Sequence, residues 1–288
     1  MSKQAVLKLD DQEYTFPTIE GVEHEKAVDF RTLRSVSGYV SYDEGYGNTG
    51  SCQSEITFID GEIGILRYRG IPIEQLAKNS DFIESSYMLL YGDLPTQAER
   101  DRFSGLIKNH AAVSPLMANA LKGFPSDAPP MGILGSMLGA MSCYNQDIAT
   151  NNRVTDLENF DAAAATAIAQ TATSAALAYR VTRGLEGNQP DASLSFQDNF
   201  LHMMFSEPGK PYVAIPEVSR ALDLMLLLHA DHEQNCSTST VRMVASGGAN
   251  LFASVSAGAA ALWGPAHGGA NMAVIKMLEE IKESGDDG

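Results

Sequence analysis

The segment FDAAAATAIAQTATSAALAYRVTRG, residues 160–184, constrains the fold more than any other part of the chain. Alanine has the highest helix propensity and a closing glycine is a common helix end, so we predict one long helix here. An alanine-rich surface suits very close packing against another helix. Further small residues allow short distances between helix axes, namely Gly132, Gly135, Ala140 and the run 162–165. Two alternatives follow: a helix-lined interface between copies of the chain, or tight packing inside one subunit.

The first part of the chain has a hydrophobic period of two. The stretch AVLKLDDQEYTF has strand-like halves around Asp10 and Asp11, and ITFIDGEIGILRYRG has two β-rich runs around Asp60 and Gly61. An Asp-Gly pair between such runs is a strong signal for a hairpin turn. We therefore predict a small β-rich unit over residues 1–70.

The signals beyond residue 70 belong to helices. Thr96 and Glu99 have the spacing of a capping box, and Ser114 has the position of an N-cap. Proline at the first helical position marks three helix starts, at Pro115, Pro130 and Pro216. We predict a mainly α fold, with a helical large domain over residues 71–288 that follows the β-rich unit.

The charge balance restricts the partners of the chain. Acidic residues exceed basic ones by 36 to 20, a net charge of −16, so a polyanion such as nucleic acid is disfavoured. An anionic substrate would need a local cluster of cations. Cys52, Cys143 and Cys236 form no CxxC pair, and no targeting signal or membrane-spanning stretch is apparent, so we expect a cytoplasmic protein with no membrane partner.

The stretch LHADHEQN places two histidines, His229 and His232, three residues apart at the end of a predicted helix. This spacing predicts both side chains on one side of its last turn. Together with Asp231 and Glu233 they could hold a divalent ion, or they could simply be a hydrogen-bonded helix end. The HExxH pattern of zincins is absent, and a di-metal bundle needs Glu-x-x-His pairs on several helices. A substrate site is the third alternative, and the next motif favours it.

The stretch LWGPAHGGAN sets His267 among Gly264, Gly268 and Gly269, just before a helical run. Glycines let a backbone approach a ligand closely, and the positive end of a helix dipole disfavours a charged imidazole. We therefore expect a neutral His267, which could donate a hydrogen bond to a carbonyl that becomes an enolate, as in triosephosphate isomerase. Ser237 is the side chain that we expect to orient the ring.

These motifs resemble citrate synthase of the bacterial type II class. The resemblance is carried mainly by three stretches, HADHEQN, STSTVR and GANLFASVSAGAAALWGPAHGGAN. Four earlier stretches also match the family, namely CQSEITFIDGEIGILRYRGIPIEQLA, SSYMLLYGDLPT, NFLHMMF and YGNTGSC. It covers essentially the whole chain from about residue 30. It implies condensation of acetyl-CoA with oxaloacetate in the tricarboxylic acid cycle, with hydrolysis of citryl-CoA to citrate and CoA. No metal and no permanently bound cofactor is implied.

The resemblance also implies roles for individual residues. His267 matches the catalytic histidine that hydrogen-bonds the thioester carbonyl and stabilises the enol. His232 matches the histidine that binds oxaloacetate, with His229 and Asn235 assigned to the same site. Three glycines are assigned to the acetyl-CoA site, namely Gly264, Gly268 and Gly269. Near these motifs, Arg220 and Arg242 are the available cations.

Members of this family continue past the equivalent of Gly288, through a motif like GFGHRVYK, an aspartate base and several arginines that bind carboxylates. None of these is in the sequence. We therefore expect the chain to be the N-terminal part of a citrate synthase, without the small domain that closes over the substrate, and inactive by itself. The family resemblance implies a homodimer or a hexamer.

His110 and Tyr144 lie where the type II class places contacts to its inhibitor NADH. The neighbouring stretch DAAAATAIAQ contains no Arg or Lys, so the sequence disfavours this regulation, and a helix-surface role for His110 is the alternative. Other functions remain as alternatives for the chain: 2-methylcitrate synthase, which uses propionyl-CoA, a metal-binding helical module, or a purely structural piece.

Overall fold

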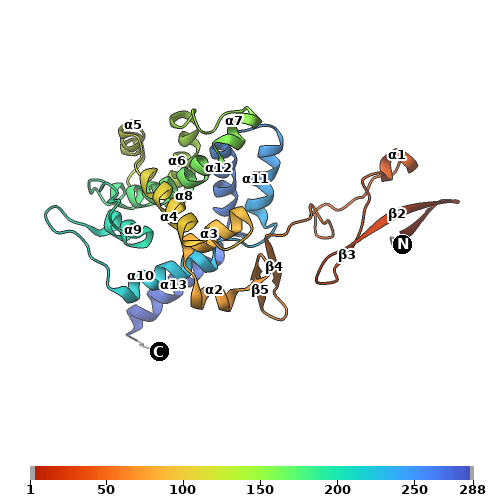
Figure 1. The fold of residues 1–288 in the computed structure, drawn as a ribbon, viewed down its shortest axis with the longest axis horizontal. Helices are drawn as coiled ribbons and strands as arrows, with labels where there is room; N and C mark the ends of the chain where they lie inside the picture. The colour runs from red at the N-terminus through yellow and green to blue at the C-terminus, as the bar shows by residue number, and fades with distance from the viewer. Residues whose placement is uncertain (1–3, 286–288) are drawn as a thin grey trace. The chain divides into compact units, whose positions relative to one another are not determined.

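The computed structural model describes residues 4–285 and divides into two compact units, residues 1–54 and 55–288 (Figure 1). The outermost ends of the predicted β-rich unit and helical domain, residues 1–3 and 286–288, lie outside the described part of the chain. The two units are therefore described one at a time.

The first unit is built on a three-stranded antiparallel sheet. Its strands are β1 (Gln4–Leu9), β2 (Gln12–Glu20) and β3 (Lys26–Val28), in the order β1-β2-β3, followed by the short helix α1 (Leu33–Ser37). Leu9 pairs with Gln12, so Asp10 and Asp11 form the turn, with Asp10 at a left-handed φ of 53°. The strand-like halves predicted around Asp10 and Asp11 are confirmed, and they form a hairpin.

The second unit begins with a small antiparallel sheet of order β4-β5-β6, made of β4 (Thr57–Asp60), β5 (Ile65–Tyr68) and β6 (Ile71–Pro72). The hairpin predicted at Asp60 and Gly61 is confirmed, but its turn is longer than this pair of residues. Asp60 pairs with Ile65, and the Asp60 carboxylate accepts the backbone N–H groups of Glu62 and Ile63. These bonds and the φ of 71° at Gly64 close a turn of residues 61–64.

The rest of the second unit is helical, which confirms the mainly α fold. Its helices are α2 (Ile73–Asn79), α3 (Phe82–Tyr91), α4 (Gln97–Asn109), α5 (Pro115–Ala120), α6 (Pro130–Tyr144), α7 (Arg153–Glu158), α8 (Phe160–Val181), α9 (Phe196–Phe205), α10 (Pro216–Leu228), α11 (Cys236–Ser246), α12 (Leu251–Leu262) and α13 (Gly269–Ser284). The predicted capping box of Thr96 and Glu99 is present, and Ser114 caps the start of α5. Proline begins α5, α6 and α10 as predicted.

The predicted alanine-rich helix, α8, contacts α4, α6 and α9 (Figure 1). Ala163, Ala164 and Ala165 are buried within this one chain. Gly132 of α6 brings that helix close to α12, because a Cβ on it would lie 3.2 Å from the ring of Trp263. Tight packing inside one subunit, one of the two alternatives, is therefore confirmed for these residues.

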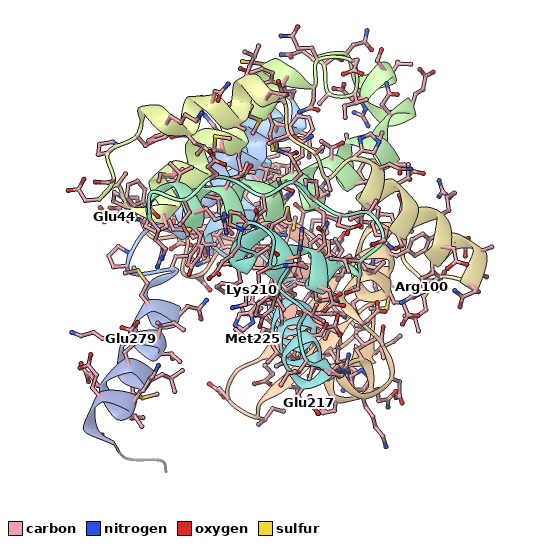
Figure 2. The ribbon with its side chains drawn as sticks, turned by 90° about the vertical axis from the view of Figure 1, so that its left-hand side faces the viewer. Glu44, Arg100, Lys210, Glu217, Met225 and Glu279 are labelled. Atoms are coloured by element: carbon pink, nitrogen blue, oxygen red, sulfur yellow. The ribbon has the colours of Figure 1, made fainter. Side chains whose placement is uncertain are left out.

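The last helix, α13, has no buried residue among those described, and the same is true of α7 and α11. In Figure 2, α13, which carries Glu279, projects away from the other helices of the second unit. Several of its apolar side chains are exposed: Met272, Val274, Ile275, Met277, Leu278 and Ile281. Within the described residues, no helix combines the length and the hydropathy needed to cross a membrane.

A polar junction fastens α3 and α4 to the start of α8. The Asp161 carboxylate accepts hydrogen bonds from the Tyr91 hydroxyl and from the Arg102 guanidinium, each at 2.6 Å. These two donors hold the pKa of Asp161 below its usual value. A carboxyl group of this kind stabilises the fold above its unfolded pKa, and the stabilisation is lost as the pH falls through the lowered folded value.

We therefore expect Asp161→Asn to lower the free energy of unfolding by about 1 kcal/mol at pH 7, because these charge-assisted bonds are partly exposed to solvent. The difference from the parent chain should shrink below about pH 4, where the unfolded carboxyl binds a proton. Urea unfolding followed by circular dichroism at several pH values measures both effects. A difference independent of pH would show that the carboxylate charge is not responsible.

Candidate active site

The two neighbouring histidines lie where α10 ends. The helix stops at Leu228, His229 is its C-cap, and His232 belongs to the irregular segment 229–235, called the histidine turn below. The prediction that both residues lie on the last helical turn is wrong for His232. Their rings nevertheless remain neighbours, with centroids 5.9 Å apart.

Both histidine rings contact carbonyl groups of the last turn of α10. His229 Nδ1 lies 2.7 Å from the Met225 carbonyl oxygen, and His232 Nε2 lies 3.4 Å from that of Leu228. A carbonyl can only accept, so these ring nitrogens are the protonated donors. The contact of His229 is short and that of His232 is long. Both residues are exposed, so their remaining ring atoms are accessible.

Asn235 links the histidine turn to α11. It is the N-cap of α11, and its Oδ1 accepts the Thr238 backbone N–H at 2.9 Å. The same oxygen accepts the Ser237 hydroxyl at 2.9 Å, and Asn235 Nδ2 donates to the His232 carbonyl oxygen at 3.3 Å. One amide side chain therefore caps the helix and ties it to the backbone of His232.

His267 precedes α13, whose N-cap is Gly268, so its predicted place at a helix start is confirmed. Its Nε2 accepts the Ser237 backbone N–H at 3.2 Å. Ser237 is the predicted partner of the ring, but its backbone makes the contact and its hydroxyl does not. A backbone N–H can only donate, so Nε2 carries no proton and the neutral ring carries it on Nδ1. Hydrogen bonds thus tie the Asn235 amide to the His232 backbone carbonyl and to the Ser237 hydroxyl, and tie the Ser237 backbone N–H to the ring of His267.

The glycines beside His267 have different environments. A Cβ on Gly268 would lie 2.2 Å from the Leu262 carbonyl oxygen, so a side chain cannot be accommodated without moving backbone. A Cβ on Gly264 would lie 3.3 Å from the Ala261 carbonyl oxygen, and one on Gly269 would meet only Pro265, at an ordinary 3.6 Å. The sequence suggested a close approach of the glycine backbone to a ligand. At Gly268 the close approach is instead to the Leu262 carbonyl, and this contact sets the path of the chain from α12 to α13.

The two arginines near the motifs are engaged in different ways. The Arg220 guanidinium donates to the Ala77 and Ser80 carbonyl oxygens and pairs with Asp223 at 2.5 Å. Arg220 is therefore part of the packing of α10 against α2 and α3, and the expectation that it is an available cation is wrong. Arg242 is exposed on α11 and donates to the Gln234 side chain at 2.8 Å, which places it beside the histidine turn.

His110 is tied to α8. Its Nδ1 lies 2.9 Å from the Thr166 hydroxyl oxygen, and that hydroxyl donates to the Ala162 carbonyl oxygen at 2.7 Å, so the ring donates to Thr166. His110 is half-buried, so the helix-surface alternative describes it only in part. Tyr144 is exposed at the end of α6, and among the described residues no hydrogen bond joins it to His110.

Within residues 4–285, no cluster of three or more His, Cys, Asp or Glu side chains has the arrangement of a metal site. Asp231 and Glu233, the acidic residues of the metal alternative, have other partners. Asp231 Oδ1 accepts the Glu233 backbone N–H at 2.8 Å, and Glu233 Oε1 accepts the Ile59 backbone N–H at 2.6 Å. The metal-binding alternative therefore gains no support.

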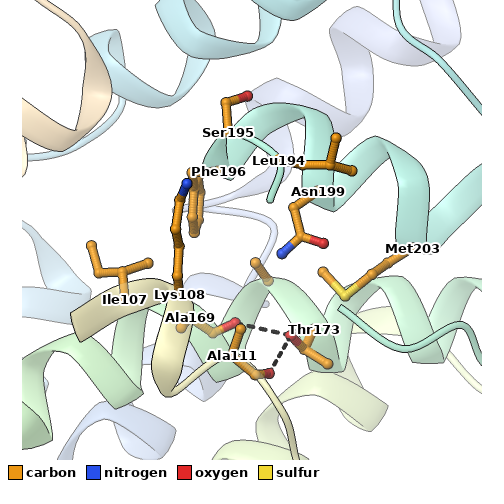
Figure 3. Close-up of a pocket in the computed structure, with 11 residues that line it drawn as sticks. Ile107, Lys108, Ala111, Ala169, Thr173, Leu194, Ser195, Phe196, Asn199 and Met203 are labelled. Carbon is orange, nitrogen blue, oxygen red and sulfur yellow. Dashed lines mark hydrogen bonds between the residues drawn. The ribbon is translucent and has the colours of Figure 1, made fainter. Parts of the chain in front are cut away.

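A separate cavity lies between α4, α8 and α9 (Figure 3). Its lining includes Lys108, Thr173 and Asn199, and the Thr173 hydroxyl donates to the Ala111 carbonyl oxygen at 2.7 Å. A volume of about 10 Å³ has room for about one water molecule. The cavity contains none of the predicted site residues and is too small for a substrate.

Two residues that the sequence did not predict to hold the histidine turn do so in the structure: Tyr68, and Glu233 through its contact with Ile59. The Tyr68 hydroxyl donates to the Leu227 carbonyl oxygen at 3.2 Å and accepts the Asp231 backbone N–H at 3.3 Å. Burial raises the pKa of this hydroxyl, so it remains a donor. A tyrosine at the end of a predicted strand gives no local signal for such a contact.

A family model described as the citrate synthase C-terminal domain matches residues 45–287. The chain belongs to the citrate synthase family. The family inferred from the motifs is thus confirmed, whereas its type II subclass stays a prediction.

Two curated relatives cover almost the whole chain. Citrate synthase 1 of Mycobacterium tuberculosis is 45% identical over 285 residues, which are 98% of this chain and 65% of that protein. The citrate synthase of Corynebacterium glutamicum is 44% identical over 283 residues, 98% of this chain and 64% of that protein. The chain therefore spans less than two thirds of the length of either relative.

Solved citrate synthases share the fold. The enzyme from Pyrobaculum aerophilum has a TM-score of 0.75 at 32% identity, over 92% of this chain and 62% of that one. The citrate synthase of Thermoplasma acidophilum, solved in a ternary complex with carboxymethyl coenzyme A and oxaloacetate, also has a TM-score of 0.75, at 28% identity. That match covers 84% of this chain and 61% of the other.

The contact between Ser237 and His267 makes a prediction about the tautomer of the ring. Long-range ¹H–¹⁵N spectra of histidine-labelled chain should show His267 with its proton on Nδ1, and the signal is assigned by its loss in His267→Gln. Ser237 lies in the first turn of α11, where backbone N–H groups have no partner within the helix, so its N–H is available to the ring. A ring with its proton on Nε2 would contradict the hydrogen bond.

Proposed function

We propose that the chain forms the part of a citrate synthase that binds oxaloacetate and polarises acetyl-CoA. The reaction condenses these substrates and hydrolyses citryl-CoA to citrate and CoA, as in the tricarboxylic acid cycle. The observation that carries the proposal is the set of hydrogen bonds that fastens the backbone of His232 and the ring of His267 to the same segment, Asn235 and Ser237. The substrate analogue and oxaloacetate in the Thermoplasma acidophilum complex support the choice of ligands.

His267 is assigned to the thioester of acetyl-CoA. Its Nε2 is occupied by the Ser237 N–H, which leaves Nδ1–H to donate to the thioester carbonyl oxygen. When a base removes a methyl proton, its electron pair moves into the enol and the negative charge collects on that oxygen. A donor aimed at developing charge lowers the barrier. We assign no base among the described residues.

His232 is assigned to oxaloacetate. Its ring donates to Leu228 over a long 3.4 Å contact, so transferring that N–H to the ketone oxygen costs little. The methyl-derived carbon of the enol then bonds to the ketone carbon, and the C=O electron pair moves to the ketone oxygen. The proton removed by the base balances this charge and makes the hydroxyl of citryl-CoA. Water then cleaves the thioester, its OH joining the citrate carboxyl carbon and its H the CoA thiol. His229 keeps its short 2.7 Å contact and supports the neighbouring ring, and Asn235 holds the turn in place.

The proposal extends to the cofactor, the compartment and the oligomeric state of the protein. The chain needs no permanently bound cofactor, and its three cysteines are free, which supports a reducing compartment such as the cytoplasm. The exposed apolar side chains of α13 are compatible with a homodimer or a hexamer. The type II class remains part of the proposal. We do not propose regulation by NADH, because the Nδ1–H donor of the His110 ring is already bonded to the Thr166 hydroxyl.

The rival enzyme is 2-methylcitrate synthase, which would use the same histidines with propionyl-CoA. Comparing kcat/KM for acetyl-CoA and propionyl-CoA, in an active protein that contains these 288 residues, decides between the two. We expect acetyl-CoA to be preferred by at least about tenfold, the range that one methylene changes in a fitted pocket. A preference for propionyl-CoA would establish the rival. We further propose that the chain alone supports no turnover, since we assign no base within residues 4–285.

In the same active protein, His267→Ala should lower kcat by at least about two orders of magnitude, because it removes a donor to the enol oxygen. It should leave the affinity for oxaloacetate nearly unchanged. His232→Ala should chiefly raise the KM for oxaloacetate. His24→Ala, which alters an exposed histidine of the first unit, is the control and should change neither constant. Near-normal turnover of the His267 variant would remove that residue from the mechanism.

A further inference from the structure

The histidine turn is fastened to the hairpin of β4 and β5 at two points. The first is Tyr68, the last residue of β5, whose side chain is completely buried. Its hydroxyl donates to the Leu227 carbonyl oxygen and accepts the Asp231 backbone N–H. One hydroxyl therefore binds the end of α10 and the start of the turn, on either side of His229.

The second point is the carboxylate of Glu233, which follows His232 directly. It accepts the backbone N–H of Ile59 in β4 at 2.6 Å. β4 is an edge strand of its sheet, so N–H groups on its outer side need partners from outside the sheet. Glu233 supplies such a partner, and its carboxylate is used to hold the turn.

The backbone at Glu233 explains why the turn needs such contacts. Its φ is 57°, in the left-handed region that residues other than glycine rarely adopt. The chain bends at this residue, between His232 and Asn235. Strained conformations persist only where surrounding contacts hold them. At Glu233 there are two such contacts: its carboxylate accepts the Ile59 N–H, and its own backbone N–H donates to the Asp231 carboxylate.

We propose that Tyr68 and Glu233 are positioning residues for His232, and that the β4–β5 hairpin thereby sets the affinity for oxaloacetate. This inference rests on the function proposed above. Loss of either contact lets the turn leave the conformation that binds the substrate, and the apparent affinity falls with the competent fraction. Bound oxaloacetate restores the turn, so the loss appears in KM and leaves kcat at saturation nearly unchanged.

Three variants of an active protein that contains the chain test this inference. Tyr68→Phe and Glu233→Ala should each raise the KM for oxaloacetate by about fivefold or more, the change expected for one lost hydrogen bond. Glu233→Gln keeps an acceptor oxygen for the Ile59 N–H and should restore most of the affinity. Alanine retains a Cβ, so the backbone preference at φ 57° is the same in both Glu233 variants.

The matched control is Tyr91→Phe, which removes another hydrogen-bonded tyrosine hydroxyl, partly buried and 2.6 Å from Asp161, without touching the histidine turn. It should reduce stability and leave the KM for oxaloacetate unchanged. An equal rise in KM for the control, a fall in kcat alone, or a Gln variant as impaired as the Ala variant would each overturn the positioning role.

A spectroscopic measurement on the 288-residue chain separates this inference from the proposed function. In ¹³C-histidine spectra, Glu233→Ala should shift or broaden the ring signals of His229 and His232, while those of His110 and His202 stay in place. This outcome supports the positioning role even if the protein proves to have another activity. Ring signals and KM that both stay unchanged would overturn it and leave the proposed function intact.

Discussion

The candidate site depends on one hydrogen bond, from the Ser237 backbone to the His267 ring. It joins the starts of α11 and α13 through two residues that lie 30 positions apart in the sequence. A hydroxyl could donate or accept, but a backbone N–H held by a helix can only donate. The ring nitrogen that faces it is therefore fixed as an acceptor, and the opposite nitrogen as a donor. The same contact joins the two helix starts and decides which nitrogen of His267 can donate a hydrogen bond to the proposed substrate.

The histidine turn holds its shape through polar contacts, because it has no regular secondary structure of its own. Tyr68 and Glu233 attach it to a hairpin, and Asn235 attaches it to α11. Each contact satisfies a backbone group at the end of a helix or at the edge of a sheet, which would otherwise lack a partner. An irregular segment can present a functional ring in one orientation only when rigid elements hold it in this way.

Helix starts and hairpins could be predicted because their signals are local. Pro216 at the first position of α10 and the pair of Thr96 and Glu99 act within one helical turn. The end of α10 could not be predicted in this way, because the residues after Leu228 contain no glycine or proline. The chain leaves the helix where Asp231 meets the Tyr68 hydroxyl, across a sequence separation of 163 residues. The place of His232 outside the helix follows from that distant contact.

The net charge of −16 raises the question of how a dicarboxylate could approach the site. Arg220 does not help, because its guanidinium is occupied by carbonyl groups and Asp223. At physiological salt, charges more than about 8 Å away are largely screened, so the field near the histidines depends on local groups. Two of these are the positive ends of α11 and α13, which begin next to Ser237 and His267. Helix ends and neutral imidazole donors can therefore favour an anion locally, although the chain as a whole repels it, and Arg242 beside the turn adds a full positive charge.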